Sequence, residues 1–331
     1  MQSDSKPIVS KKTSVHKFYD ASFVTEYGKI ESMRAARYNS NFSVLLMSME
    51  GSDGRLADSD SVEYLKRMSG SVLESVRNCD VLGVIEDRQL VAILPETDYF
   101  GSLVAIRKIS KTVNGFVAKE NLPISPLFSQ ATFPKDGKGY GALVSTAAKR
   151  LAEKKNSLWV KLELKDRLFW EIIGEITNTA FKGFENSTFD AGGGYPLGEN
   201  FIDHINDLII KEITASPFKR GILYLVSKKL SSNMPSINNL EQLGSLSTKV
   251  FLVGQPDDNM RDIKNTSTLF LDDPRLKEAF FSLYLSEDGG YALICKENWG
   301  STFTCFHTSD PFLVDGLINK FQIEYTLQEQ L

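Results

Sequence analysis

The stretch from residue 77 to residue 95 constrains the fold of this chain more than any other part. Two apolar runs, residues 81–85 and 90–94, flank a charged turn, and Pro95 closes the second run. Short apolar runs on either side of a polar turn are typical of a β-hairpin. The sequence therefore predicts two neighbouring antiparallel strands in the first half of the chain.

Length and charge limit the number of domains and the kinds of partner. A chain of 331 residues predicts about two domains. Hydrophobic residues make up 42% of the chain and charged residues 24%, which are values of an ordinary soluble protein. The formal net charge of −4 indicates no basic face, so nucleic acid is not expected as a partner.

The cysteines and the terminal sequence bear on the compartment. Cys79, Cys295 and Cys305 are far apart and lack metal-ligand spacing, so we expect neither a disulfide scaffold nor a metal centre. A reducing cytoplasm suits them best. No apolar run approaches the roughly 18 residues that span a bilayer. Residues 1–15 are polar and lysine-rich, and we expect a disordered tail without an apolar signal core.

Hydrophobic periodicity divides the following residues into helices and strands. The expected helices cover residues 16–37, 62–76, 99–117 and 138–155, and the expected strands cover residues 42–49, 81–85, 90–94, 123–133 and 159–164. The last of these strands is predicted from its strict alternation of apolar and polar residues. The order predicts an α/β (α+β) domain over residues 16–164, with a mixed central sheet flanked by helices.

Residues 165–331 predict a second α/β domain. The expected helices are residues 168–184, 200–214 and a final one from residue 310, and the expected strands are residues 221–226, 250–253, 268–271, 280–285, 291–295 and 303–307. Gly289 and Gly290 separate two of these strands and indicate a hairpin. Asp310 can cap the last helix, and Pro311 suits its first turn.

In the order of its elements, the first domain resembles the GGDEF domain of bacterial diguanylate cyclases, which has a nucleotidyl cyclase-like fold. The likeness is carried by residues 42–49, 62–76, 94–97, 133–137 and 147–155 and by the hairpin. In that family an Arg-x-x-Asp pair precedes a Gly-Gly-Asp/Glu-Glu-Phe turn. Arg77 and Asp80 stand at the pair, and Glu86, Asp87, Arg88, Gln89 and Leu90 stand at the degenerate turn.

The same resemblance implies that the catalytic chemistry is lost. The family holds divalent metal with an Asp at the end of the first strand, where this chain has Ser48, with Glu50 two positions further as an alternative ligand. Glu86 and Asp87 replace the glycines that let the backbone approach the nucleotide. The guanine-recognising Asp falls on Val62. We therefore expect a pseudoenzyme without catalytic residues, metal or cofactor, and a weakly active cyclase is the least favoured alternative.

Arg77 and Asp80 are the candidate binding residues. The family uses this pair as an inhibitory cyclic di-GMP site, so the resemblance implies a guanidinium that donates to a phosphate or guanine edge and a carboxylate that accepts from guanine N–H groups. The resulting hypothesis is a non-catalytic signalling protein that acts as a cyclic di-GMP receptor and protein-interaction scaffold. Two alternatives stay open: the pair is only a surface ion pair, or the altered turn docks a protein without any nucleotide.

The resemblance also suggests partners. Besides cyclic di-GMP, we expect a signalling protein such as a response regulator or a polar scaffold, and a homodimer is compatible with the sequence. Residues 165–331 resemble the DICT domain, a sensory module found with diguanylate cyclases, through residues 250–257, 268–276, 292–295 and 307–314. That likeness implies signal input or partner binding without assigned chemistry. Cys305 and His307 have no further ligand cluster nearby and predict no site.

Overall fold

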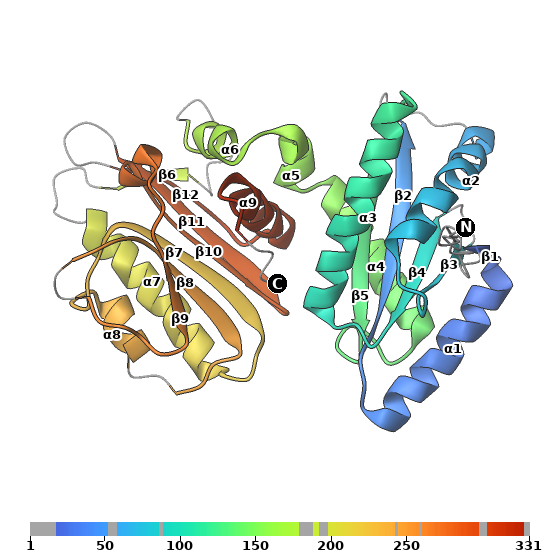
Figure 1. The fold of residues 1–331 in the computed structure, drawn as a ribbon, viewed down its shortest axis with the longest axis horizontal. Coiled ribbons are helices and arrows are strands. Elements are labelled where there is room, and N and C mark those ends of the chain that lie inside the picture. The colour runs from blue at the N-terminus through green and yellow to red at the C-terminus, as the bar shows by residue number, and fades with distance from the viewer. Residues whose placement is uncertain are drawn as a thin grey trace, which may run out of the picture. The chain divides into compact units, whose positions relative to one another are not determined.

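The computed structural model describes residues 18–51, 58–85, 89–178, 188–191, 198–241, 244–257, 260–297 and 303–327. The chain forms two compact units, Met1–Glu153 and Lys154–Leu331 (Figure 1). The expected tail at residues 1–15 lies outside the described residues. The expected division into a degenerate GGDEF domain and a DICT-like domain after residue 164 stays a prediction.

The first unit contains one five-stranded mixed sheet. Its elements are β1 (Phe18–Tyr19), α1 (Ala21–Tyr38), β2 (Phe42–Gly51), α2 (Asp58–Ser75), β3 (Val81–Val84), β4 (Leu90–Pro95), α3 (Tyr99–Lys119), β5 (Ile124–Phe133) and α4 (Tyr140–Lys155). The strand order is β1-β3-β4-β2-β5, in which β1 and β3 are parallel and the other neighbours are antiparallel. The hairpin that the sequence predicts is confirmed as β3 and β4.

Alternation along β4 explains how the sheet is covered on both faces. Leu90 and Ala92 belong to a core with apolar residues of α2 and α3, whereas Val91 and Ile93 belong to a core with residues of α1 and α4. Successive side chains of a strand point to opposite faces. A strand of consecutive apolar residues is therefore sandwiched between helices, with α2 and α3 on one side and α1 and α4 on the other.

The second unit contains a seven-stranded mixed sheet. Its elements are α5 (Leu158–Lys161), η2 (Leu164–Asp166), α6 (Phe169–Ile176), β6 (Thr188–Ala191), α7 (Gly198–Ala215), β7 (Gly221–Leu230), α8 (Pro235–Glu241), β8 (Thr248–Pro256), β9 (Thr266–Leu269), η4 (Pro274–Lys277), β10 (Ala279–Ser286), β11 (Gly289–Glu297), β12 (Phe303–Thr308) and α9 (Pro311–Glu324). The strand order is β6-β12-β11-β10-β7-β8-β9. β7, β8 and β9 are parallel, and the other neighbours are antiparallel.

Helices also cover both faces of this second sheet. Ile210 of α7 and Ile237 of α8 share a core with Leu223 of β7. On the other side, Phe169 of α6 and Phe321 of α9 pack at a centroid separation of 5.2 Å. Edge-on and tilted aromatic pairs of this kind add to the energy of apolar burial. The predicted fold class, α/β with mixed sheets flanked by helices and a second α/β region, is confirmed.

One expected strand is wrong. Residues 159–164 alternate as an edge strand should, but the structure places Leu158–Lys161 in the helical turn α5 and Leu164–Asp166 in η2. A Cβ at Gly316 of α9 would lie 2.4 Å from the Trp159 ring. The ring therefore packs directly on the α9 backbone, and this tertiary contact overrides the local alternation.

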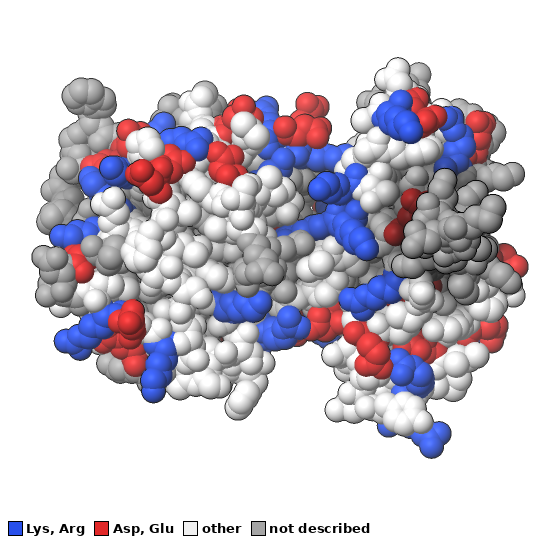
Figure 2. Space-filling model, viewed as in Figure 1, with Lys and Arg blue, Asp and Glu red and all other residues white. Residues whose placement is uncertain are grey.

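The distribution of charge agrees with the small net charge. On the face drawn in Figure 2, both Lys or Arg and Asp or Glu side chains occur on each unit. Among the described residues, no helix is long and apolar enough to span a bilayer.

Candidate ligand site at the helix-to-strand turn

The turn between α2 and β3 carries both predicted binding residues. The backbone N–H of Arg77 donates to Oδ2 of Asp80 at 2.7 Å, and the N–H of Asp80 donates to the Arg77 carbonyl at 3.0 Å. Side chains of Asp commonly close turns in this way. The contact between the two residues is thus made by the backbone of Arg77, while its side chain is exposed at the surface.

Arg77 borders a polar pocket of about 290 Å³. The other lining residues are Asn41, which precedes β2, and Glu96, Thr97, Asp98 and Gly101, which lie where β4 passes into α3. Asp80 is not part of this lining, and its carboxylate closes the turn that contains Arg77. Arg77 was a candidate binding residue from the sequence, and the other lining residues were not; a binding role for any of them stays a prediction.

The junction opposite Arg77 has a defined local geometry. Oδ1 of Asp98 accepts from the N–H of Gly101 at 2.8 Å and caps α3. Glu96 adopts a left-handed backbone conformation, with a φ of 49°, and its carboxylate is 2.9 Å from Nη2 of Arg34. The pocket is therefore lined by one basic residue, Arg77, and two acidic residues, Glu96 and Asp98, and the carboxylate of Glu96 is paired with Arg34.

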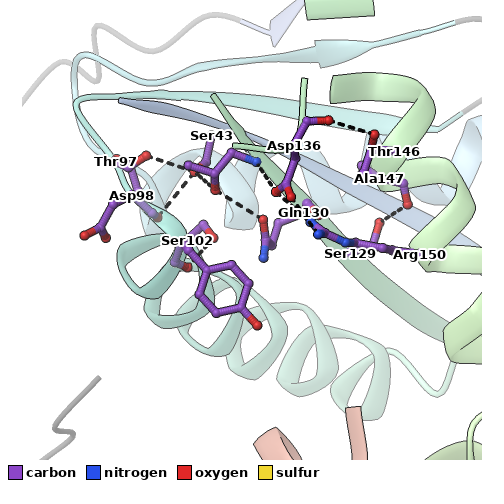
Figure 3. A network of polar contacts seen from close by, with 12 residues as sticks. Ser43, Thr97, Asp98, Ser102, Ser129, Gln130, Asp136, Thr146, Ala147 and Arg150 are labelled. Carbon is purple, nitrogen blue, oxygen red and sulfur yellow. Dashed lines mark hydrogen bonds and ion pairs between the residues drawn. The ribbon is translucent and has the colours of Figure 1, made fainter. Parts of the chain in front are cut away.

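A buried polar network fixes this junction from behind (Figure 3). The Ser43 hydroxyl on β2 donates to the Thr97 carbonyl at 2.9 Å and shares a 2.7 Å hydrogen bond with the Thr132 hydroxyl on β5. The Thr97 hydroxyl donates to the Pro95 carbonyl at 3.0 Å. Buried polar groups that are all hydrogen-bonded make a rigid framework. The pocket wall is therefore anchored to the centre of the sheet.

The same network continues to α4 through an ion pair. Both guanidinium Nη atoms of Arg150 lie 2.7 Å from the two carboxylate oxygens of Asp136, whose side chain is 6% exposed. Oδ2 of Asp136 also accepts from the N–H of Thr132 at 2.8 Å. Asp136 stands in the segment Phe133–Gly137 that supports the family resemblance. Its observed role is to join the end of β5 to α4.

The turn predicted at residues 86–90 is only partly described. Glu86, Asp87 and Arg88 lie outside the described residues. The Gln89 carbonyl accepts from the N–H of Ile85 at 3.0 Å and closes the hairpin. Leu90 was grouped with this turn, but it begins β4 and is 1% exposed. This is a correction to the predicted docking surface: Leu90 belongs to the hydrophobic core, and its side chain is not available for docking.

The positions that align with the family's catalytic residues are placed as follows. Ser48 lies on β2 opposite Leu127 of β5, and its buried hydroxyl has no hydrogen-bond partner among the residues that the structure describes. Glu50 follows two positions further on the same strand, and Val62 lies in α2. Within the described residues there is no group of three His, Cys, Asp or Glu side chains that could hold a metal ion.

The structure shows what surrounds the cysteines, the histidine and the helix-cap residue named in the second half of the sequence. Cys305 on β12 is buried directly opposite Cys295 on β11, and both thiols are free. Oδ1 of Asp310 accepts from the N–H of Phe312 at 2.9 Å, so the predicted cap of α9 is confirmed. His307 lies on β12, and its ring centroid is 6.1 Å from that of Tyr291.

Of three comparisons with known proteins, one found similar proteins, and these are solved structures. No protein-family model matches the chain, and no curated protein matches it. The GGDEF domain of YfiN (TpbB) from Pseudomonas aeruginosa is 15% identical, with a TM-score of 0.37, covering 42% of this chain and 91% of that one. The active GGEEF domain of a diguanylate cyclase from Vibrio cholerae is 12% identical, with a TM-score of 0.37 and coverages of 43% and 94%.

A third similar structure is the GGDEF domain of DgcB from Caulobacter crescentus in complex with c-di-GMP. It is 8% identical to this chain, with a TM-score of 0.33, and the match covers 46% of this chain and 94% of that one.

Proposed function

We propose that the first unit is a degenerate GGDEF domain that binds cyclic di-GMP beside Arg77 and serves as a non-catalytic receptor. The observation that carries this proposal is the position of Arg77. Arg77 borders a polar pocket, and the Asp80 carboxylate accepts a hydrogen bond from its backbone N–H. A site on a rigid turn loses little conformational entropy when a ligand binds to it.

The chemistry of the pocket favours a guanine base. A guanidinium can donate two hydrogen bonds to O6 and N7 of guanine, as it does in nucleic-acid recognition. The carboxylates of Glu96 and Asp98 provide acceptors for the N1–H and N2–H groups of the same base. These carboxylates repel a phosphodiester, so we assign the base to the pocket and the phosphates to the solvent side of Arg77.

Loss of catalysis is the second part of the proposal. Diguanylate synthesis needs metal-bound phosphates, and the position of the family's strand ligand is occupied by the buried hydroxyl of Ser48. Glu86 and Asp87 would bring two carboxylates to the place where the family's turn meets a triphosphate. Incubation of the protein with GTP and magnesium should therefore yield no cyclic di-GMP above a protein-free control. Accumulation of product would overturn the pseudoenzyme assignment.

Calorimetric titration tests the receptor assignment. Wild-type protein should bind cyclic di-GMP, and Arg77→Ala should bind it at least about tenfold more weakly, because a charge-assisted hydrogen bond contributes roughly 1.5–3 kcal/mol. Arg67→Ala, an exposed substitution on α2 that removes an ion pair with Glu120, is the matched control and should bind as wild type does. Cyclic di-AMP should bind more weakly than cyclic di-GMP, because adenine lacks the N1–H donor.

Two outcomes would reject this assignment. Absence of heat with the wild type at concentrations that saturate known receptors removes the receptor role. Equal loss of binding in Arg77→Ala and Arg67→Ala removes the site. The nucleotide-independent alternative, docking of a protein through the altered turn, rests on residues 86–88 outside the described part of the chain. We further propose that the second unit provides signal input or partner binding, as its DICT-like sequence implies.

A further inference from the structure

A second pocket lies wholly within the unit Lys154–Leu331. It occupies about 410 Å³ between α7 and the turn that joins β10 to β11. This volume falls within the roughly 300–1,000 Å³ that is typical of small-molecule sites. Gly289 and Gly290 of the predicted hairpin line this pocket, whereas Arg77 and Asp80 do not, so it is separate from the Arg77 site.

One wall of the pocket is apolar. Ile205, Leu208 and Ile209 line it from α7, and their spacing of three and four residues places them on one helix face. Leu208 is 49% exposed, whereas Ile209, Ile210 and Ile213 of the same helix are buried in the core of the unit. An exposed leucine that borders a concave surface is suited to contact the hydrocarbon body of a ligand.

The opposite side of the pocket contains two tyrosines. Tyr284 on β10 and Tyr291 on β11 are direct partners in the antiparallel ladder, so their side chains leave the same face of the sheet next to each other. Tyrosine rings combine an apolar body with a face of negative electrostatic potential. Such rings attract organic cations as well as aromatic groups.

Three charged groups stand at the rim. Nζ of Lys219 is 2.8 Å from Oδ2 of Asp288 and 4.0 Å from Oε1 of Glu212. One ammonium and two carboxylates sum to a formal charge of −1. The Lys219 side chain is 19% exposed, whereas that of Glu212 is 65% exposed. The excess negative charge is therefore accessible to a ligand that approaches from solvent.

We propose that this pocket binds a small organic cation, an amine with an aromatic or aliphatic body. The body packs on the α7 wall and the tyrosine rings, and the ammonium group meets the carboxylates of Glu212 and Asp288. An anion of the same size would be repelled by the net negative charge of the rim. A neutral analogue would gain no attraction from that charge. This pocket shares no lining residue with the proposed cyclic di-GMP site, which belongs to the other unit.

Three probes of one shape test this inference on the full chain: 2-phenylethylammonium, 2-phenylethanol and 3-phenylpropanoate. Ligand-observed NMR should show binding of the ammonium in the millimolar range, with the alcohol and the carboxylate at least about tenfold weaker. Leu208→Trp should fill the mouth of the pocket and remove binding. Glu212→Gln should lower the preference for the ammonium over the alcohol by severalfold.

Glu278→Gln is the matched control, since it makes the same charge change at an exposed position of the same unit that does not line the pocket. It should leave the preference unchanged. The inference is contradicted if the ammonium does not bind, if the three probes bind equally, or if Glu212→Gln and Glu278→Gln have the same effect. Thermal unfolding of each variant confirms that it is folded before the probes are compared.

Discussion

The backbone N–H of Arg77 lies 2.7 Å from Oδ2 of Asp80, so the acidic member of the predicted pair closes the turn that displays the basic member. The two residues therefore have different structural surroundings. Arg77 borders the pocket, and Asp80 positions Arg77. Substitutions at the two positions should consequently differ in their effects on binding and stability.

Removal of the Asp80 carboxylate should weaken the turn. Asp80→Ala should lower the free energy of unfolding by about 1 kcal/mol, the contribution of one such hydrogen bond, and should also weaken cyclic di-GMP binding. Asp80→Asn keeps an acceptor oxygen and should retain most of both properties. Urea unfolding and calorimetry measure the two effects. Glu74→Ala, an exposed substitution near the end of α2, is the control, and equal behaviour of Asp80→Ala and this control would contradict the positioning role.

The Arg150–Asp136 pair should stabilise the first unit far more than its surface neighbours do. Asp136→Ala leaves a guanidinium without its partner in a largely buried place and should cost about 3 kcal/mol of unfolding free energy. Lys149→Ala removes the adjacent exposed pair with Glu153 at 3.7 Å and should cost at most about 0.5 kcal/mol. Chemical denaturation compares the two variants, and similar costs would show that the network of Figure 3 does not hold the sheet to α4.

Acid should destabilise the second unit through Asp273. The Arg275 guanidinium beside this carboxylate holds its pKa at about 2, below the ordinary value near 3.9. A carboxyl whose folded pKa is lowered contributes stability that is complete above its unfolded pKa. That stability, about 2 kcal/mol, is lost as the pH falls from about 4 toward 2.

Unfolding midpoints measured between these pH values should therefore fall steeply in the wild type and less steeply in Asp273→Asn. Asp272→Asn changes the adjacent exposed carboxyl and serves as the control. Parallel pH profiles for the wild type and Asp273→Asn would contradict the contribution of Asp273.

The three cysteines should differ in reactivity. Cys79 is exposed, whereas Cys295 and Cys305 are buried as direct neighbours on β11 and β12. Contact with the Cys305 thiol, together with burial, raises the pKa of Cys295. Because the thiolate is the reactive form, a native sample should show one fast-reacting thiol and a denatured sample three. Fast reaction of all three thiols in native protein would contradict the burial of Cys295 and Cys305 between β11 and β12 and their neighbours.

Much of the first unit could be predicted from local sequence pattern. The consecutive apolar residues of β4 fill both cores of the sheet, and this pattern is visible without a structure. The helical turn at residues 158–161 could not be predicted, because the deciding contact joins Trp159 to Gly316 across a long stretch of chain. The alternation of residues 159–164 shows which side chains are apolar, but it does not show which distant part of the chain they contact.

The residues that line the pocket beside Arg77 could be predicted only in part. Arg77 precedes β3 and can be recognised from the Arg-x-x-Asp pattern that it forms with Asp80. The pocket opposite it depends on Glu96 and Asp98, which the fold brings back from the far end of the hairpin. Pro95 followed by an acidic residue and Asp98 before an apolar helix marks a capped junction, and this was the available signal. The hydrogen bond from the Arg77 backbone to the Asp80 carboxylate could not be predicted, because it depends on the conformation of the turn.

Alkylation of Cys79 tests the central claim most directly, because this exposed thiol lies between Arg77 and Asp80. Saturating cyclic di-GMP should slow the alkylation of Cys79 severalfold in the wild type, and Arg77→Ala should need an at least about tenfold higher nucleotide concentration for the same protection. An unchanged rate in wild-type protein that calorimetry shows to be fully occupied would contradict the account and place the nucleotide elsewhere.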